Sequence, residues 1–419
     1  MMVRKNALLG TSCGLLLILS AWPQVGAHVS SRADQDWAIT VETLPSPAGA
    51  NSAEPQLTAH GGRVTLSWIE RNGSRASVKL AGRTTSGWSD VRTVVSGTNL
   101  FVNAADVPSA LELSDRTLVA HWLREGSGNP DAYDVRLSWS KDGGVTWSQP
   151  TSPHHDGTQT EHGFASLFNG PNGGVGIVWL DGRKTNPEAP EGSAEAGDMG
   201  LRAAVYGPDR RQRGETLIAP RVCECCSTSV AETSEGLIVA FRSRSATEVR
   251  DVFVSRFADG HWSAPTPVHE DGWQIKACPI NGPALSARDR DVAVVWFTMQ
   301  NDEGHTFLAF SRDGGRTFGQ PVRVDDVSSL GKVSVALLQD GSAAVSWIEF
   351  AEKRSQLKAR RIEPSGVRSN AVTLAGIANG QTSGVPRLVL SGDELLFAWT
   401  ETNNGTSQVR TARAALRER

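Results

Sequence analysis

Four cysteines in two short segments are the residues whose type and spacing best suit chemistry. Cys223, Cys225 and Cys226 lie within four residues of one another, and Cys278 follows in a later segment. In an exported protein four cysteines usually pair as two disulfides, which predicts a bridge from Cys278 to one of the other three. Pairing the remaining two within so short a segment would need a strained ring. Thiolates also bind copper or zinc, so a metal site at the four cysteines is the alternative.

Three histidines are candidates for additional ligands at such a metal site. His154, His155 and His162 lie in one segment between two apolar runs. Imidazole nitrogens are frequent ligands of both zinc and copper, alone or together with thiolates. We therefore expect any bound copper or zinc to lie where the cysteines and the histidines meet.

Charged and polar residues that follow apolar strands are candidates for binding a ligand or acting on it. A pair of carboxylates can cleave a glycosidic bond. The catalytic candidates are Asp181, Glu349 and Glu401. Guanidinium groups suit a carboxylate or another anion because they donate two parallel hydrogen bonds. The candidate ligand-binding residues are Arg183, Arg242, Arg244, Trp273 and Asn281.

A repeated strand pattern has to position these residues. An apolar strand that ends in an aromatic residue recurs along the chain, at Trp68, Trp122, Trp179, Phe241, Trp296, Trp347 and Trp399. Most copies follow a short apolar strand, and each precedes a strand of alternating apolar and polar residues. Four short strands in each repeat are the unit of a β-propeller blade. The sequence therefore predicts an all-β, seven-bladed β-propeller.

The two ends of the chain are expected to close this ring. The last repeat has only three evident strands, and an unassigned strand, Trp37–Glu42, precedes the first repeat. Pairing of Trp37–Glu42 beside Val409–Ala414 would complete the seventh blade and remove two open strand edges. Connections into successive first strands share one face of a propeller. We therefore expect the four cysteines to form one cluster there, together with Arg242, Arg244 and the three histidines.

Two turns carry a second recurring pattern. Residues 140–147 and 311–318 both read Ser-x-Asp-x-Gly-x-Thr followed by an aromatic residue. The aspartate can accept backbone hydrogen bonds within the turn, and the glycine tolerates positive φ. The residues of this pattern are Asp142, Gly144, Trp147, Asp313, Gly315 and Phe318. The pattern resembles the Asp-boxes, or BNR repeats, of the sialidase-like superfamily, where these turns lie away from the catalytic face, so we expect a structural role.

The resemblance to sialidases covers most of residues 36–419 and implies a propeller related to glycans, with six blades as the alternative to seven. Sialidases clamp a carboxylate with three arginines and use a tyrosine nucleophile near the end of the chain. This chain has only Tyr133 and Tyr206, both in its first half. We expect a protein that binds an anionic, glycan or metal ligand on the face of blades three to five, without ordinary sialidase activity. The alternative is an exo-sialidase-like glycoside hydrolase that uses the carboxylates and arginines of that face.

The remaining features concern export and partners. Residues 1–27 carry Arg4 and Lys5 before an apolar run and end in small residues, which is typical of a secretory signal peptide. Residues 28–419 are expected to form one periplasmic or secreted domain, without a membrane span after signal cleavage. The motifs Cys-x-Cys-Cys and Cys-Pro-Ile-Asn-Gly-Pro resemble an exported bacterial subgroup of the superfamily. A net charge of -3 argues against nucleic acid, so the expected partner is a glycan, a small anion or an exported protein.

Overall fold

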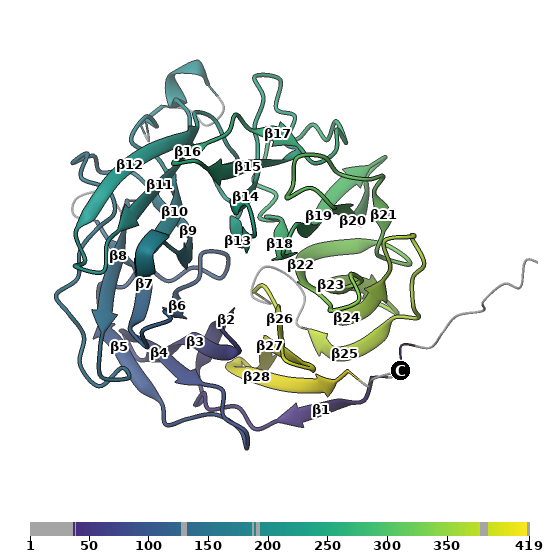
Figure 1. The fold of residues 1–419 in the computed structure, drawn as a ribbon, viewed down its shortest axis with the longest axis horizontal. Coiled ribbons are helices and arrows are strands. Elements are labelled where there is room, and N and C mark those ends of the chain that lie inside the picture. The colour runs from purple at the N-terminus through teal and green to yellow at the C-terminus, as the bar shows by residue number, and fades with distance from the viewer. Residues whose placement is uncertain are drawn as a thin grey trace, which may run out of the picture. The chain divides into compact units, whose positions relative to one another are not determined.

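The computed structural model describes Trp37 and residues 39–126, 132–186, 188–189, 193–377 and 384–416. Within the unit Asp36–Arg419, the described strands form seven small antiparallel sheets arranged in a ring, which is a seven-bladed β-propeller (Figure 1). The predicted fold is confirmed, with seven blades and not six. The predicted signal peptide lies outside the described residues. Among the described residues, no helix has the length and apolar character needed to span a membrane.

The blades follow the chain in order. Blade one contains β2 (Ser52–His60), β3 (Arg63–Asn72), β4 (Arg75–Gly82) and β5 (Arg92–Gly97). Blade two contains β6 (Ser109–Glu112), β7 (Leu118–Glu125) and β8 (Tyr133–Ser140). Blade three contains β9 (His162–Asn169), β10 (Val175–Asp181), β11 (Gly200–Tyr206) and β12 (Gln212–Ala219). Blade four contains β13 (Ser229–Thr233), β14 (Gly236–Arg242) and β15 (Val252–Ala258), with β16 (His261–Trp262) and β17 (Thr266–Pro267) both paired to β15.

The remaining blades repeat the same plan. Blade five contains β18 (Ala284–Arg288), β19 (Asp291–Gln300), β20 (Glu303–Ser311) and β21 (Val322–Arg323). Blade six contains β22 (Ser329–Leu337), β23 (Ala343–Ala351), β24 (Arg354–Ile362) and β25 (Val372–Ile377). Blade seven contains β26 (Arg387–Ser391), β27 (Glu394–Asn403), β28 (Thr406–Ala415) and β1 (Val41–Leu44). Two 3-10 turns, η1 (Pro171–Gly173) and η2 (Ala194–Ala196), lie in the connections of blade three.

The middle of the second strand of each blade is mainly apolar because each blade packs between two neighbours. In β10, Ile177 and Trp179 pack in one cluster with Leu137 of blade two. Val178, which points to the other face of the strand, packs in another cluster with Val239 of blade four. Burial on both faces explains why these strands read as continuous apolar runs, and why the bulky aromatic residue recurs.

Strand β1 closes the ring as the sequence predicts, but it begins later than expected. It pairs antiparallel with β28, with Val41 opposite Ala414 and Leu44 opposite Thr411. Trp37 precedes the strand and is only 9% exposed, because its indole packs in the cluster between blades six and seven. Burial of this ring, not strand pairing, holds the chain ahead of β1.

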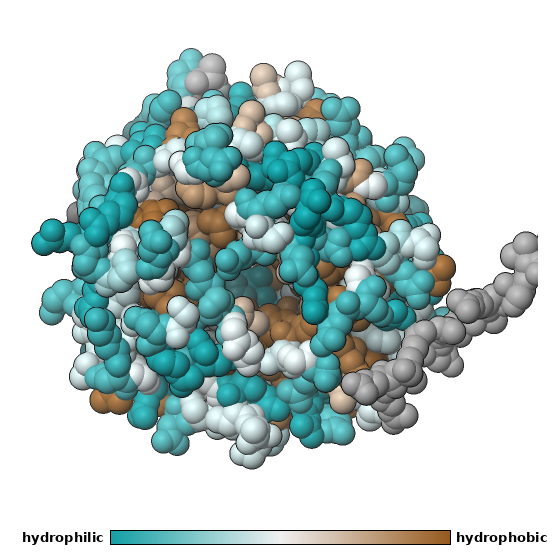
Figure 2. All heavy atoms as spheres, in the orientation of Figure 1, coloured by the Kyte–Doolittle hydropathy of each residue, from teal (hydrophilic) through white to brown (hydrophobic). Residues whose placement is uncertain are grey.

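One end of the ring carries the candidate functional residues, and we call it the upper face. Here second strands end and first strands begin, so that Asp181 at the end of β10 lies opposite His162 at the start of β9. The Asp-box turns lie at the other end, since Ser140 at the end of β8 pairs with Leu118 at the start of β7. The first strands of all seven blades line a central channel of about 500 Å³. Figure 2 shows the hollow at the centre of the ring.

Both Asp-boxes are held by hydrogen bonds within the turn. Asp142 accepts bonds from the backbone N–H groups of Val145 and Thr146 at 3.1 and 2.9 Å, and Asp313 accepts the equivalent bond from Thr317 at 3.0 Å. The Thr146 hydroxyl and these backbone bonds lower the pKa of Asp142 to about 2, and against the effect of burial the Thr317 backbone and hydroxyl bonds lower that of Asp313 to about 2. The aromatic residues Trp147 and Phe318 pack against two of the core clusters, and Gly144 and Gly315 have φ of +86° and +80°.

Candidate functional site on the upper face

A Trp-x-carboxylate motif recurs where the second strands end. In blade one the Trp68 indole donates to Glu70 at 2.9 Å, and Lys79, which lies opposite Trp68 in the next strand, pairs with Glu70 at 2.7 Å. Blade six repeats this arrangement. The Trp347 indole donates to Glu349 at 3.1 Å, and Lys358 pairs with the same carboxylate at 2.6 Å.

Two of the sequence-derived catalytic candidates, Glu349 and Glu401, each pair with a cation of the next strand, but only Glu349 also accepts an indole; Trp399 Nε1 is buried without a hydrogen bond. Glu349 is fully buried, and although burial raises its pKa, bonds from Lys358, the Asp326 backbone and Trp347 hold the pKa below its usual range. Glu401 pairs with Arg410 at 2.8 Å across β27 and β28, and its side chain is 32% exposed. With its lowered pKa and its fixed partner Lys358, Glu349 is a poor general acid, and this ion pair ties β23 to β24.

The third catalytic candidate, Asp181, is held in the same way in blade three. It is 1% exposed and accepts the Trp179 indole at 2.8 Å. Arg183 donates two bonds to it at 2.6 and 2.8 Å, which is the bidentate pairing of guanidinium with carboxylate. Although burial raises the pKa of Asp181, Arg183 and His162 lower it by more. The structure therefore places Arg183 on a carboxylate of the protein itself.

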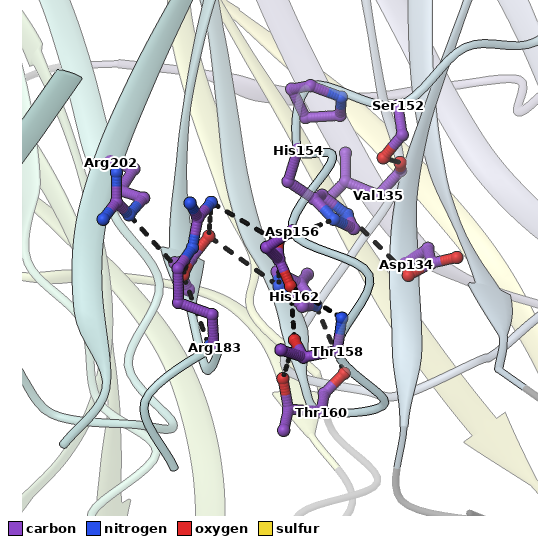
Figure 3. A network of polar contacts seen from close by, with 12 residues as sticks. Asp134, Val135, Ser152, His154, Asp156, Thr158, Thr160, His162, Arg183 and Arg202 are labelled. Atoms are coloured by element: carbon purple, nitrogen blue, oxygen red, sulfur yellow. Dashed lines mark hydrogen bonds and ion pairs between the residues drawn. The ribbon is translucent and has the colours of Figure 1, made fainter. Parts of the chain in front are cut away.

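Two imidazoles complete a network around Asp181, which we call the blade-three network: His154, Asp156, His162, Asp181 and Arg183. Figure 3 shows His154, Asp156, His162 and Arg183 of this network. The rings of His154 and His162 are stacked, with centroids 3.8 Å apart and planes within 5°. Asp156 lies between these rings and Arg183, with its Oδ2 at 3.2 Å from His162 Nε2 and 3.4 Å from Arg183 Nη2. Burial, followed by the charge of His162, lowers the pKa of His154 to about 3, so His154 is neutral at neutral pH. His155 is exposed and lies outside this network.

The blade-three network has some features of a metal site. His162 Nδ1 faces the Thr160 carbonyl at 3.2 Å, which directs Nε2 toward Asp156 and Asp181, and this Nε2 is buried without a hydrogen bond. Three other features favour an ion-pair network. Asp181 Oδ2 already accepts two bonds, Arg183 supplies the positive charge beside Asp156, and two stacked rings cannot both point at one ion in their own planes.

The cysteines lie in a different cluster from the histidines. Cys225 and Cys278 form a disulfide, which confirms the predicted bridge between the connections of blades four and five. Cys223 and Cys226 are buried free thiols. A single metal site made by all four cysteines and the histidines therefore does not fit the structure, because the bridge takes up two sulfurs and the imidazoles face Asp156 and Asp134.

The remaining ligand-binding candidates are also engaged with the protein. Arg242 is 1% exposed and donates to the backbone carbonyls of Asn281, Arg250 and Phe297 at 2.9, 2.6 and 2.7 Å. Its guanidinium lies 5.0 Å from the ring centre of Trp273. Arg244 pairs with Glu248 at 2.9 Å. These residues tie the connections of blades four and five together.

Blade two carries cations at both positions of the Trp-x-carboxylate pair, and among the described residues neither cation has a firm partner. Arg124 stands where blades one, three, six and seven have the carboxylate, and Arg136 lies opposite Trp122 where those blades have its partner cation. The only described carboxylate near Arg124 is Asp134, at 3.9 Å. Arg136 Nε is buried without a hydrogen bond, and burial followed by the charge of Arg124 lowers the pKa of Arg136.

Both arginines line a cleft of about 830 Å³ between blades two and three. Its other lining residues include Asn99, His155 and Gln159, and its inner wall includes the buried His154. A volume of this size lies within the ~300–1,000 Å³ of typical ligand pockets. None of the described residues that line it is Arg183, Arg242, Arg244, Trp273 or Asn281, so the cleft lies beside blade two and not over blades four and five.

Neither tyrosine is placed as an exposed nucleophile. Tyr133 is 4% exposed and its ring stacks on Phe101 with centroids 4.0 Å apart. Burial, then the charges of Asp106 and Glu161, raise the pKa of Tyr133 well above 10. Tyr206 is 2% exposed and donates to the Ser152 carbonyl at 3.1 Å, and burial raises its pKa too. A phenol with a raised pKa is a weak nucleophile.

No protein-family model matches the chain, and no curated protein matches it. Among solved structures, the phage phi92 endosialidase aligns at a TM-score of 0.51 with 10% identity, over 91% of this chain and 70% of that chain. The polysaccharide lyase Uly1 aligns at 0.51 with 10% identity, over 87% and 89% of the two chains. A fungal alcohol oxidase of the AA5 family, solved in complex with copper, aligns at 0.50 with 13% identity over 90% and 75%. At these identities the likeness shows the β-propeller fold alone.

The sequence analysis missed Arg136 and the cleft beside it. Arg124 differs from the Glu or Asp that follows the aromatic residue by two positions in blades one, three, six and seven. Comparison of the repeats position by position would have found this exception. The cross-strand position of Arg136 follows from the same repeat once the register is known.

Proposed function

We propose that the protein binds an acidic glycan through the carboxylate of a sugar unit, in the cleft between blades two and three. The observation that carries this proposal is the pair of cations in the cleft, Arg124 and Arg136, for which the described residues supply no firm carboxylate partner. A buried guanidinium nitrogen without an acceptor is costly, and a ligand carboxylate would supply the acceptor that the fold omits. Polar side chains around the pair, such as Asn99, suit sugar hydroxyl groups.

The solved structures that share this fold include proteins that act on glycans, which supports a glycan ligand. Two of the aligned propellers are an endosialidase and a polysaccharide lyase. We propose a binding role because the three catalytic candidates, Asp181, Glu349 and Glu401, are each paired with a cation of the protein, and because both tyrosines are buried. Purified protein is therefore expected to release little or no sialic acid from a fluorogenic sialoside. We also propose that the protein acts in the periplasm or outside the cell, from the signal-peptide pattern of residues 1–27.

Isothermal titration with trigalacturonate, and with its methyl ester as a neutral control of the same shape, tests the proposal. The acid should bind and the ester should bind at least about tenfold more weakly, because the charged hydrogen bonds to Arg124 and Arg136 are worth about 1.5–3 kcal/mol. Arg136→Gln should weaken binding of the acid about 10- to 100-fold. Arg75→Gln is the matched control, since Arg75 is exposed on blade one and carries the same charge.

Three results would overturn this function. The first is equal affinity for acid and ester, and the second is unchanged affinity in Arg136→Gln. The third is the absence of binding by any member of a panel of uronate, sialoside and sulfated oligosaccharides at low ionic strength, where such contacts are strongest.

A further inference from the structure

The two free thiols, Cys223 and Cys226, lie side by side on the upper face. Cys223 and Cys226 have the Cys-x-x-Cys spacing, and their sulfurs are 2.9 Å apart. Each residue is 1% exposed. The neighbouring disulfide, Cys225–Cys278, fixes the segment that carries both thiols to the connection of blade five. The pair is therefore held in place without being bonded.

The surroundings of Cys223 favour a negative charge. Arg250 Nη1 donates to Cys223 Sγ at 3.3 Å, and the same buried guanidinium pairs with Glu224 at 2.9 Å and with Glu248 at 3.1 Å. Arg242 is buried close by and bonds only to backbone carbonyls; within the described part of the chain no carboxylate lies within 4.0 Å of its nitrogens. A buried cation without a carboxylate partner favours a nearby anion. The Cys223 thiolate can provide it.

The two thiols differ in acidity. Burial would raise the pKa of Cys223, but the hydrogen bond it shares with Cys226, the Cys225 backbone N–H and the two arginines lower it to about 7. Burial and the adjacent Cys223 raise the pKa of Cys226 well above 9. A thiolate that is ionised near neutral pH, beside a thiol that keeps its proton, is the arrangement of an attacking and a resolving cysteine.

We propose that Cys223 and Cys226 are a redox-active dithiol that a hydroperoxide oxidises to a second disulfide. The Cys223 thiolate attacks one oxygen of the peroxide, the O–O bond breaks, and the leaving hydroxide takes a proton to become water. This gives a sulfenic acid at Cys223. Cys226 then loses its proton and attacks the Cys223 sulfur, the S–O bond breaks, and a second water leaves. Two thiols and one hydrogen peroxide thus give one disulfide and two waters.

Burial selects the oxidant. Cys223 and Cys226 are each 1% exposed, which closes them to the disulfide of another protein and favours a small oxidant such as hydrogen peroxide. Exchange with the existing bridge is the internal alternative, since Cys223 Sγ lies 3.8 Å from Cys225 Sγ. That exchange would form a Cys223–Cys225 disulfide, whose Cys-x-Cys ring is strained. Cys226 is therefore the better partner for Cys223.

The experiment is a peroxide titration of the full chain, first equilibrated with limiting dithiothreitol, and followed by denaturing alkylation and peptide mass spectrometry. We expect two alkylatable thiols to disappear together, with a cross-linked Cys223–Cys226 peptide, while Cys225–Cys278 stays intact. Dithiothreitol should restore both thiols. The rate should rise about tenfold from about pH 6 to about pH 8, and not the nearly hundredfold expected for a thiol with a pKa of 9.

Two variants separate the roles of the thiols. Cys226→Ser should trap the sulfenic acid at Cys223, which dimedone labels. Cys223→Ser should leave Cys226 at least about tenfold less reactive, because its thiol remains protonated. Cys226→Ala serves where the serine variant does not fold. Thiols that resist peroxide in the folded protein, loss of the Cys225–Cys278 bridge in the same step, or direct overoxidation of Cys223 while Cys226 stays free would each overturn the proposal.

Discussion

Replacement of Glu349 by Gln tests whether the upper-face carboxylates are clamps or catalytic groups. The change keeps an acceptor for the Trp347 indole but leaves Lys358 beside a neutral group. At the 2.6 Å separation of Lys358 Nζ and Glu349 Oε1, the gross attraction is about 6 kcal/mol for an effective dielectric constant of about 20. Breaking one half of such a buried pair costs about 3–5 kcal/mol, and the 16% exposure of Lys358 moves the expected loss to about 3 kcal/mol.

Equilibrium urea unfolding, followed by tryptophan fluorescence, measures this loss. Glu401→Gln is the matched control, because it breaks the equivalent pair in blade seven, where the Arg410 and Glu401 side chains are 42% and 32% exposed. There the loss should stay below about 1 kcal/mol. Adding Lys358→Met to Glu349→Gln should recover most of the lost stability, because it removes the unpaired cation. Equal small losses in Glu349→Gln and Glu401→Gln, with ligand binding or turnover abolished only in the first, would refute the clamp interpretation.

Two further predictions concern Asp106, which is buried, and Cys278, which is exposed, on the same face. Burial, opposed in part by the bond from the Phe164 N–H, raises the pKa of Asp106 to about 7. The unfolded chain therefore loses this proton at lower pH than the folded chain, and stability falls as the pH rises from about 4 to about 7. Asp106→Asn should remove this part of the pH dependence, as seen in urea unfolding of both proteins across that range; identical slopes would show that Asp106 is ionised throughout. Cys278→Ser should lower the free energy of unfolding by about 2–5 kcal/mol because it opens the bridge between blades four and five, and an unchanged value would assign that bridge no structural role.

The fold could be predicted from the sequence because its signal is local and repeated. Each blade packs on two neighbours, so the second strand of each blade is buried on both faces. A tryptophan such as Trp179 or Trp347 recurs in these strands and identifies them in the sequence. The closing strand followed from the missing fourth strand of the last repeat. The start of this strand was predicted too early because Trp37 is apolar. Its ring packs in the cluster between blades six and seven, whereas strand pairing begins at Val41.

The site could be predicted only in part because its contacts join distant residues. The bridge to Cys278 was expected, but the choice of Cys225 depends on the path of two loops and not on spacing. Asp181 has the residue type of a catalytic group, but its carboxylate accepts hydrogen bonds from Trp179 and Arg183 of the same blade. Arg136 was missed because an arginine in an alternating strand resembles any solvated cation. Arg136 lies opposite Trp122, as the paired cations of other blades lie opposite their tryptophans. It differs from them because Arg124 stands where those blades have the carboxylate.

The most direct test of the central claim is the position of a bound acidic sugar. A crystal structure of the protein with trigalacturonate should place one carboxylate in the cleft between blades two and three, with its oxygens about 2.7–2.9 Å from Arg136 Nε and from the Arg124 guanidinium. The Trp-x-carboxylate pairs of the other blades should stay closed in the same crystal. A sugar bound in the central channel or over blades four and five, with Arg124 and Arg136 untouched, would contradict the account.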